Sequence, residues 1–423
     1  MRKKIIVRGP FLTRSGYGEH ARLILRALRT VENKLDIYAI PLSWGHTSWL
    51  NELGEEREWF DLIINKTNAA IQSGMRDFDM SIQISIPNEW EKLAPLNIGV
   101  TAGIETTKVA LQWLEKGNLV DHIIVPSEHS KDVYKNTSYS VVVENTGQRI
   151  ENYKCTKPIS VISYPVKQFD VKDLDLKLET DFNFLSIAQW GTRKNLENSI
   201  RWFVEEFIDQ EVGLIVKTNF AKNCLLDRQR CTTSLQYLLS DKKYQNKKCK
   251  IYLLHGDMSD EEIHNLYKHP KVKAFVSTTH GEGFGLPFFE AAYQALPVIA
   301  PDWSGHVDFL SMPVKNKKGK IRNKMMFADV SYTLGPIPDN AHWEGVIEKD
   351  SFWCYPDQGS FKIKLREVYK DYGRFAKQAK QLQKYLLDNF SEEKQNKEIV
   401  DIVLQSLGTQ DEVTINAENV VVF

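Results

Sequence analysis

The chain has 423 residues, of which 42% are hydrophobic and 26% charged, and its formal net charge is zero. The length is too great for one compact core and predicts two large lobes. The composition excludes a disordered or fibrous protein, and the charge provides no global attraction to nucleic acid or an anionic membrane, so that such a partner would have to meet a local patch.

The N-terminus is charged, but its apolar run at residues 5–7 is too short for a secretory signal and predicts a first strand. No stretch reaches the roughly eighteen apolar residues of a membrane span. The five cysteines are odd in number and scattered, and none forms a C-x-x-C pair. This pattern argues against disulfides or structural zinc and predicts a reducing, cytoplasmic location.

Short apolar runs rich in β-branched residues recur between helical stretches and fall into two sets. The first set is residues 4–7, 35–40, 81–86, 96–100 and 122–125, and the second is 182–188, 212–217, 250–254, 274–277 and 297–300. Because the runs do not alternate with polar residues, they are typical of parallel strands covered on both faces. The sequence therefore predicts an α/β fold with two doubly wound lobes.

Residues 153–181 lie between the two sets and carry prolines and a charged run, a composition suited to an interdomain linker. We place the boundary near Val166, which gives lobes at 1–166 and 167–388. Helical spacing over 361–390 and an N-cap at Ser391 predict two C-terminal helices. We expect residues 389–423 to form a helix and tail that pack back on the N-terminal lobe, with an irregular last dozen residues.

A glycine loop follows the first strand, and its Gly16, Gly18 and Ala21 fit the dinucleotide fingerprint G-x-G-x-x-A. The first glycine lies nine residues beyond Val7, and no acid follows the second strand to hold a ribose, so the pattern disfavours a nicotinamide or flavin cofactor. A glycine loop at a helix N-terminus still suits a phosphate or a sugar. A glycine turn without a ligand explains this loop equally well.

Residues 274–291 carry the most informative pattern: a strand, a loop with three glycines, and a helix with Pro287 in its first turn. Glu282 lies on the loop and Glu290 about one turn into the helix. Both carboxylates are expected at the crevice beyond the carboxyl end of the sheet, where they would accept hydrogen bonds from sugar or ribose hydroxyls. Glutamates at this spacing are common by chance, so the surrounding elements carry the signal.

With this motif the chain resembles the retaining glycosyltransferases of family four, which have the GT-B fold, and the two glutamates match their E-x7-E motif. The resemblance runs from the Gly16 loop through residues 101–106, 125–128, 185–190, 193–195 and 297–300, and fades beyond Leu310. It implies two Rossmann-like lobes facing across a cleft, with an acceptor-side N-terminal lobe and a C-terminal lobe that binds a nucleotide diphosphate sugar.

The resemblance also implies roles for individual residues. Glu282 would contact the donor sugar and Glu290 the ribose. The following backbone amides would hold sugar hydroxyls, and they belong to Gly283, Phe284, Gly285 and Leu286.

A basic pair would clamp the pyrophosphate. Lys194 matches the family's lysine, but Gln189 stands where many members carry the arginine, so we assign that role to Arg193, with Lys217 behind it. Cations and helix N-termini can stabilise charge on the leaving phosphate without a metal, so we expect no metal cofactor. The solvated start of a helix would explain Arg193 and Lys194 equally well if the resemblance were set aside.

Three further groups carry possible chemistry. Asp77 and Asp79 form a D-x-D, but they precede their strand, which favours a surface turn. His280 and His306 are candidates to line the crevice. Glu105 follows a strand of the N-terminal lobe and is a candidate to orient an acceptor.

Residues 315–324 carry six positive charges and no acid, and they predict a protruding loop. A solvated turn is the favoured interpretation. The alternatives are contacts with the phosphates of a polymeric acceptor such as DNA, or with an anionic lipid headgroup.

The sequence therefore predicts a metal-independent, retaining glycosyltransferase. It would move a hexose-like sugar from a nucleotide diphosphate sugar to a hydroxyl of a glycan or a lipid-linked glycan precursor. Two alternatives are a DNA glycosyltransferase that acts on a hydroxylated base, and a non-catalytic module that binds nucleotide sugars or glycans.

Overall fold

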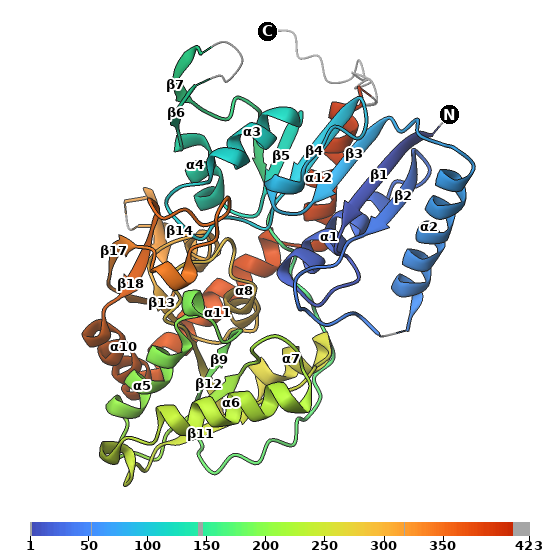
Figure 1. Ribbon diagram of the computed structural model, residues 1–423. Helices are drawn as coiled ribbons and strands as arrows, with labels where there is room; N and C mark the ends of the chain where they lie inside the picture. The colour runs from blue at the N-terminus through green and yellow to red at the C-terminus, as the bar shows by residue number, and fades with distance from the viewer. Residues whose placement is uncertain (1, 52, 143–146, 317, 409–423) are drawn as a thin grey trace.

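The computed structural model describes residues 2–51, 53–142, 147–316 and 318–408. These residues form two α/β lobes, each built on a six-stranded sheet with helices on its faces (Figure 1). Every strand pair in the two large sheets is parallel. The predicted doubly wound α/β architecture is therefore confirmed.

The N-terminal lobe has the strand order β2-β1-β3-β4-β5-β8. Its strands are β1 (Lys3–Gly9), β2 (Leu35–Pro41), β3 (Met80–Ile84), β4 (Leu96–Val100), β5 (His122–Val125) and β8 (Ile159–Val161). Its helices are α1 (Gly16–Arg29), α2 (Glu55–Gln72), α3 (Leu111–Leu119) and α4 (Glu128–Asn136), with a short 3-10 turn η1 (Pro87–Glu89). The hairpin β6 (Tyr139–Val142) and β7 (Arg149–Tyr153) projects from its side (Figure 1).

The C-terminal lobe has the strand order β11-β10-β9-β12-β13-β16. Its strands are β9 (Asn183–Ile187), β10 (Gly213–Lys217), β11 (Lys250–Leu254), β12 (Val272–Val276), β13 (Val298–Pro301) and β16 (Ala328–Val330). Its helices are α5 (Leu196–Glu206), α6 (Leu225–Leu238), α7 (Asp260–Lys268), α8 (Leu286–Tyr293), α9 (Val307–Leu310), α10 (Gln358–Lys370) and α11 (Tyr372–Asn389). Two hairpins branch from it: β14 (Ser311–Lys315) with β15 (Ile321–Met325), and β17 (Tyr332–Pro336) with β18 (Phe352–Pro356).

The strand order fixes where a ligand can bind. β9 and β12 are neighbours in the sheet, but the chain leaves β9 toward β10 and leaves β12 toward β13, so the connections diverge there. Such a switch point opens a crevice at the carboxyl ends of the strands. The glycine loop after β12 and the basic turn η2 (Thr192–Lys194) after β9 both lie at this point.

The chain crosses between the lobes twice, and the two crossings lie side by side. The segment after β8 leads into the C-terminal lobe, and its Val166 N–H donates to the carbonyl of Phe390 at 2.8 Å. Just beyond Phe390 the helix α12 (Glu392–Ser406) begins at its N-cap Ser391, and it packs on α1 of the N-terminal lobe (Figure 1). Residues 409–423, including the irregular tail from Gln410, lie outside the described part of the chain.

The helix predicted over 361–390 is wrong in one respect, because it is two helices, α10 and α11. They meet at Asp371, whose φ of −120° and ψ of 43° are not helical. The apolar spacing continues through this break because both helices pack on the same lobe.

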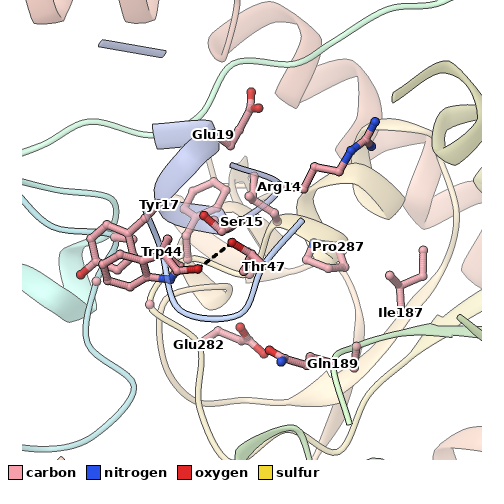
Figure 2. Close-up of a pocket in the computed structure, with 18 of the residues that line it drawn as sticks. Arg14, Ser15, Tyr17, Glu19, Trp44, Thr47, Ile187, Gln189, Glu282 and Pro287 are labelled. Atoms are coloured by element: carbon pink, nitrogen blue, oxygen red, sulfur yellow. Dashed lines mark hydrogen bonds between the residues drawn. The ribbon is translucent and has the colours of Figure 1, made fainter. Parts of the chain in front are cut away.

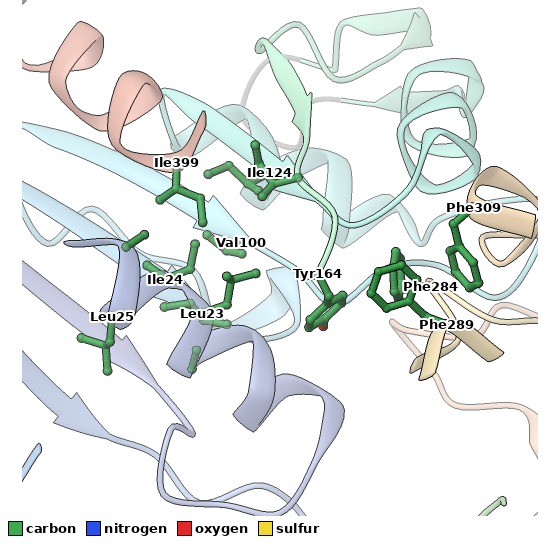
Figure 3. Close-up of a cluster of buried hydrophobic side chains, with 14 of the residues drawn as sticks. Leu23, Ile24, Leu25, Val100, Ile124, Tyr164, Phe284, Phe289, Phe309 and Ile399 are labelled. Atoms are coloured by element: carbon green, nitrogen blue, oxygen red, sulfur yellow. The ribbon is translucent and has the colours of Figure 1, made fainter. Parts of the chain in front are cut away.

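The lobes share apolar packing at the hinge. Tyr164 of the first crossing contacts Phe284 of the glycine loop with ring centroids 4.8 Å apart, and Phe284 in turn contacts Phe289 and Phe309 (Figure 3). This cluster holds the glycine loop against the N-terminal lobe.

Candidate functional site

A cleft of about 820 Å³ lies between the lobes, and residues from both line it. In the N-terminal lobe they follow β1, β2, β3 and β4, and in the C-terminal lobe β9, β10 and β12. Figure 2 shows Tyr17 and Trp44 on one side of this cleft and Glu282 with Gln189 on another. A volume of this size accommodates a small organic ligand.

Glu282 is the charged centre of the C-terminal face of the cleft. Lys194 Nζ donates to both of its carboxylate oxygens, at 2.6 and 2.7 Å, and Thr279 Oγ1 donates to Oε1 at 2.9 Å. Arg193 Nη1 lies 3.4 Å from Oε2 and also donates to the carbonyl of Gly281 at 2.7 Å. The structure therefore brings Glu282, predicted to contact the donor sugar, together with Arg193 and Lys194, the predicted pyrophosphate clamp.

The electrostatics of this cluster keep the carboxyl ionised. Glu282 is only 5% exposed, and burial alone would raise its pKa, but Lys194 and Arg193 lower the pKa to about 2. Each carboxylate oxygen accepts from at least two donors, which leaves little freedom for nucleophilic attack. The cluster is thus suited to holding hydroxyls and phosphates.

Arg193 also reaches across the cleft. Its Nη2 lies 3.4 Å from Oε1 of Glu105, on the loop after β4. Burial would lower the pKa of Arg193, but the carboxylates of Glu105 and Glu282 raise it, so this guanidinium joins the two lobes as a cation. Glu105 therefore faces the cleft, as its position after a strand predicts.

The glycine loop presents unpaired backbone donors. Within the described residues, the amide N–H groups of residues 283–286 donate to no protein acceptor. Gly285 has a φ of +95°, a conformation that favours glycine and that turns the chain into α8. Four free amides before a helix N-terminus provide the donors that anionic or hydroxylated ligands require.

Gly283 is also a point of close approach between the lobes. A Cβ there would stand 2.6 Å from the carbonyl oxygen of Ala102 and 2.8 Å from Gly103 Cα. The carbonyl of Gly283 accepts from Ser127 Oγ at 2.6 Å. Contact between the lobes therefore requires glycine at this position.

Glu290 lies in α8 and lines the same cleft. Burial raises the pKa of this carboxyl to about 7, and the hydrogen bond that Tyr267 Oη donates to Oε2 at 3.0 Å opposes the rise. The two motif glutamates thus differ, because Glu282 has two cations beside it and Glu290 has a neutral phenol.

Of the remaining residues predicted to bind the donor, two line the cleft and one does not. Gly16 lines the cleft, and Lys217 lines it with Nζ donating to the carbonyl of Gly256 at 2.6 Å. Gly18 does not line it. The Gly18 amide caps α1 by donating to Ser15 Oγ at 2.9 Å, and a Cβ would stand 2.2 Å from the carbonyl oxygen of Thr13. The assignment of Gly18 to ligand binding is therefore replaced by a packing role.

The histidines and the D-x-D lie away from the cleft. His280 stacks on Trp353 with centroids 4.7 Å apart, and His306 stacks on Phe288 at 4.6 Å, so both are packed in the lobe. Asp77 and Asp79 precede β3 and pair with lysines of β1, at the amino ends of these strands, whereas the cleft lies beyond the carboxyl ends. The surface turn favoured for this D-x-D agrees with that placement.

One group of the described residues has the proximity of metal ligands, and it comprises Asp227, Cys231 and His255. The Asp227 carboxylate accepts from three backbone amides, those of Phe220, Ala221 and Lys222, at 2.8 to 3.0 Å. His255 Nε2 lies 3.0 Å from the same carboxylate. These contacts fix the loop 219–223, which contributes residues to the cleft wall.

The basic segment 315–324 forms the tip of the β14–β15 hairpin and not a simple loop. All described residues of 315–324 are exposed, and none lines the cleft; Lys317 lies outside the described residues. In the part of the chain that the structure covers, no helix has the length and apolar character needed to cross a membrane.

Sequence reasoning missed the aromatic side of the cleft. Tyr17 stacks on Trp44 with centroids 4.0 Å apart (Figure 2), and Trp113 and Trp343 also line the cleft. Tyr17 lies between Gly16 and Gly18, so its position in the first glycine loop could have indicated that it lines the cleft. Trp343 lies in the segment between β17 and β18, which has no strand-helix pattern to place it.

Comparisons with known proteins agree with this architecture. Residues 175–317 match the family model described as glycosyl transferases group 1. No curated protein matches the sequence significantly. The matched segment contains the basic turn, the glycine loop and both motif glutamates.

Solved structures with a similar fold span nearly the whole chain. A glycosyltransferase from Rickettsia africae ESF-5 superposes with a TM-score of 0.59 at 14% identity, over 97% of this chain and 100% of its own. Sucrose-phosphate synthase from Thermosynechococcus elongatus gives 0.60 at 12%, with coverage of 97% and 100%. Anabaena HepE in complex with UDP-glucose gives 0.55 at 12%, with coverage of 95% and 99%. The GT-B fold predicted from the sequence is therefore confirmed.

Proposed function

We propose that this protein is a retaining glycosyltransferase that moves a hexose-like sugar from a nucleotide diphosphate sugar to a hydroxyl of a glycan or a lipid-linked glycan precursor. The observation that carries the proposal is the arrangement of Glu282, Lys194, Arg193 and the free amides of residues 283–286 around one cleft. The family match over this segment supports it.

The donor would lie along the C-terminal face. Lys194, Arg193 and the N-terminus of α8 supply positive charge for the pyrophosphate, and Glu290 would accept hydrogen bonds from the ribose. When the phosphate arrives, the two cations exchange part of their pairing with Glu282 for pairing with the phosphate. This exchange frees the Glu282 oxygens to accept hydrogen bonds from the sugar.

The chemistry would follow from charge placement. Negative charge grows on the leaving phosphate as the glycosidic bond breaks, and fixed cations stabilise it more in the transition state than in the ground state. Lys194 and Arg193 would supply that charge without a metal. Because the freed oxygens of Glu282 would be occupied by hydrogen bonds from the sugar hydroxyls, we propose attack by the acceptor on the same face as the departing phosphate, whose oxygen takes the acceptor's proton.

Two features bear on the reaction's context. All five cysteines are free, which supports a reducing compartment such as the cytoplasm. The basic hairpin stands outside the cleft lining, which favours a glycan over DNA as the acceptor.

Donor cleavage with and without an acceptor tests the proposal. Wild-type protein should slowly hydrolyse at least one of UDP-glucose, GDP-mannose and ADP-glucose, and Glu282→Ala should lose this activity while nucleotide binding by calorimetry persists. Binding without any cleavage or transfer would instead indicate the non-catalytic module.

A further inference from the structure

The segment between β17 and β18, residues 337–351, reaches from the C-terminal lobe to the N-terminal lobe, and we call it the cross-lobe loop. The amide of Asn88, after β3, donates to the carbonyl of Gly345 at 2.9 Å. At the base of the loop the Thr107 N–H donates to the carbonyl of Phe352 at 2.9 Å, and the Phe352 N–H donates to Thr107 Oγ1 at 3.0 Å. The loop is therefore anchored on both lobes.

The cross-lobe loop is also packed at both ends. Val346 packs against the apolar cluster of the N-terminal lobe that contains Trp113 and Ile104. Its 3-10 turn η4 (Asp339–Ala341) contacts η2, which carries Arg193 and Lys194. The loop therefore connects the N-terminal wall of the cleft with the basic pair.

Trp343 combines a backbone that is fixed by hydrogen bonds with a side chain that is exposed to solvent. Its N–H and carbonyl exchange hydrogen bonds with Ile347 at 3.1 and 2.7 Å, yet the residue is 53% exposed and lines the cleft. Burying the indole would stabilise the fold more than leaving it exposed. An exposed indole on a fixed backbone beside a cleft therefore indicates a role in ligand binding. Its flat apolar face suits the C–H face of a pyranose ring.

We propose that the cross-lobe loop forms one wall of the acceptor subsite and that Trp343 stacks on an uncharged sugar ring of the acceptor. This inference rests on the proposed glycosyltransferase function. The acceptor would then be bound mainly by the N-terminal lobe, while Trp343 of the C-terminal lobe contributes to its specificity.

The charge of this wall selects the class of acceptor. Its described residues carry one carboxylate and no cation, and they are Ile86, Glu105, Trp113, Trp343, Val346 and Ile347. Two lysines near these residues in sequence are already paired, Lys108 with Asp350 and Lys349 with Asp339 at 3.6 Å. Arg193 reaches this wall, but its Nη2 lies 3.4 Å from Oε1 of Glu105, so the two charges offset each other. The wall therefore offers a polyanion no excess positive charge, whereas a neutral sugar offers hydroxyls to Glu105 and an apolar face to the indole.

Transfer assays on Trp343 variants test this subsite. The donor is whichever of UDP-glucose, GDP-mannose and ADP-glucose the wild-type protein hydrolyses fastest. The neutral acceptor probes are octyl β-glucoside, octyl β-galactoside and maltose, and the anionic probes are a heparin hexasaccharide and a DNA duplex containing 5-hydroxymethylcytosine. The variants are Trp343→Ala, Trp343→Phe and the control Tyr237→Ala, an 83% exposed aromatic on α6.

We expect transfer to at least one neutral probe. Trp343→Ala should raise the KM for that probe about tenfold or more, the scale of losing an aromatic anchor. Donor hydrolysis without acceptor should change less than about twofold. Trp343→Phe should retain most of the affinity, and Tyr237→Ala should match the wild type.

Three results would overturn the inference while leaving the proposed function intact: an unchanged KM in Trp343→Ala, transfer to the heparin hexasaccharide alone, or donor hydrolysis with no transfer to any probe. Transfer to the DNA duplex alone would overturn both the inference and the glycan acceptor of the proposed function. The absence of donor binding and donor hydrolysis in the wild-type protein would instead refute the proposed function, and the inference would fall with it.

Discussion

Glu290 gives the proposed donor site a pH dependence that can be calculated. Burial raises the pKa of its carboxyl to about 7. In the proposed complex, ionised Glu290 accepts hydrogen bonds from both ribose hydroxyls. The protonated carboxyl can accept fewer hydrogen bonds, and these are weaker because it carries no charge. The apparent Kd for the nucleotide is then the intrinsic Kd divided by the ionised fraction.

The magnitude follows from this pKa. With a midpoint near 7, about nine tenths of the carboxyl is ionised at pH 8 and about one tenth at pH 6. Nucleotide affinity should therefore fall as the pH is lowered through 7, by up to about tenfold between pH 8 and pH 6. Isothermal titration calorimetry with UDP, GDP and ADP at these two pH values measures the change.

Two variants separate this effect from the titration of the nucleotide's own phosphate. Glu290→Gln keeps the side chain's size and should show weaker binding with only the phosphate's pH dependence. Tyr267→Phe removes the hydrogen bond that holds the pKa down, so its midpoint should move above 7. If Glu290→Gln binds like the wild type with the same pH slope, the assignment of Glu290 to the ribose is wrong.

Three further predictions concern the rest of the molecule. Lys194→Met should lower turnover by about a hundredfold while changing nucleotide affinity less, and EDTA should not affect the wild type; activity lost in EDTA and restored by manganese would argue against cation-based catalysis. Gly283→Ala should abolish transfer because its Cβ would stand 2.6 Å from the N-terminal lobe, whereas Gly191→Ala, with nothing within 4 Å, should remain active in the same assay. Replacing Lys318 and Lys320 together by serine should leave the rate and salt dependence of transfer unchanged, and a flattened salt slope would implicate the hairpin in acceptor binding.

The sequence was sufficient for the features that depend on local pattern. Continuous apolar runs identify the central strands, because a parallel strand is buried on both faces. The glycine loop after β12 predicts a crevice because free amides, a left-handed Gly285 and a helix N-terminus depend on neighbouring residues alone. The grouping of Lys194 with Glu282 follows from the position of η2 and this loop at one switch point.

The missed features depend on contacts between distant residues. β8 and β16 have three residues each and pair only because the sheet edge is available to them. The tight packing of Gly18 is an exception, because it depends on the carbonyl of Thr13 in the same loop, a local contact that the glycine pattern does not reveal. The cross-lobe loop acquires its place from bonds to Asn88 and Thr107, residues more than two hundred positions away in the chain.

The anomeric configuration of the sugar released from the donor tests the central claim most directly. UDP-glucose, GDP-mannose and ADP-glucose all carry α-linked sugars, and proton NMR distinguishes the α and β anomers before they interconvert. With EDTA present, the wild-type protein should release the α anomer first from at least one of these donors, and Glu282→Ala should release far less. Initial release of the β anomer, or no cleavage of any of the three, would contradict a retaining glycosyltransferase.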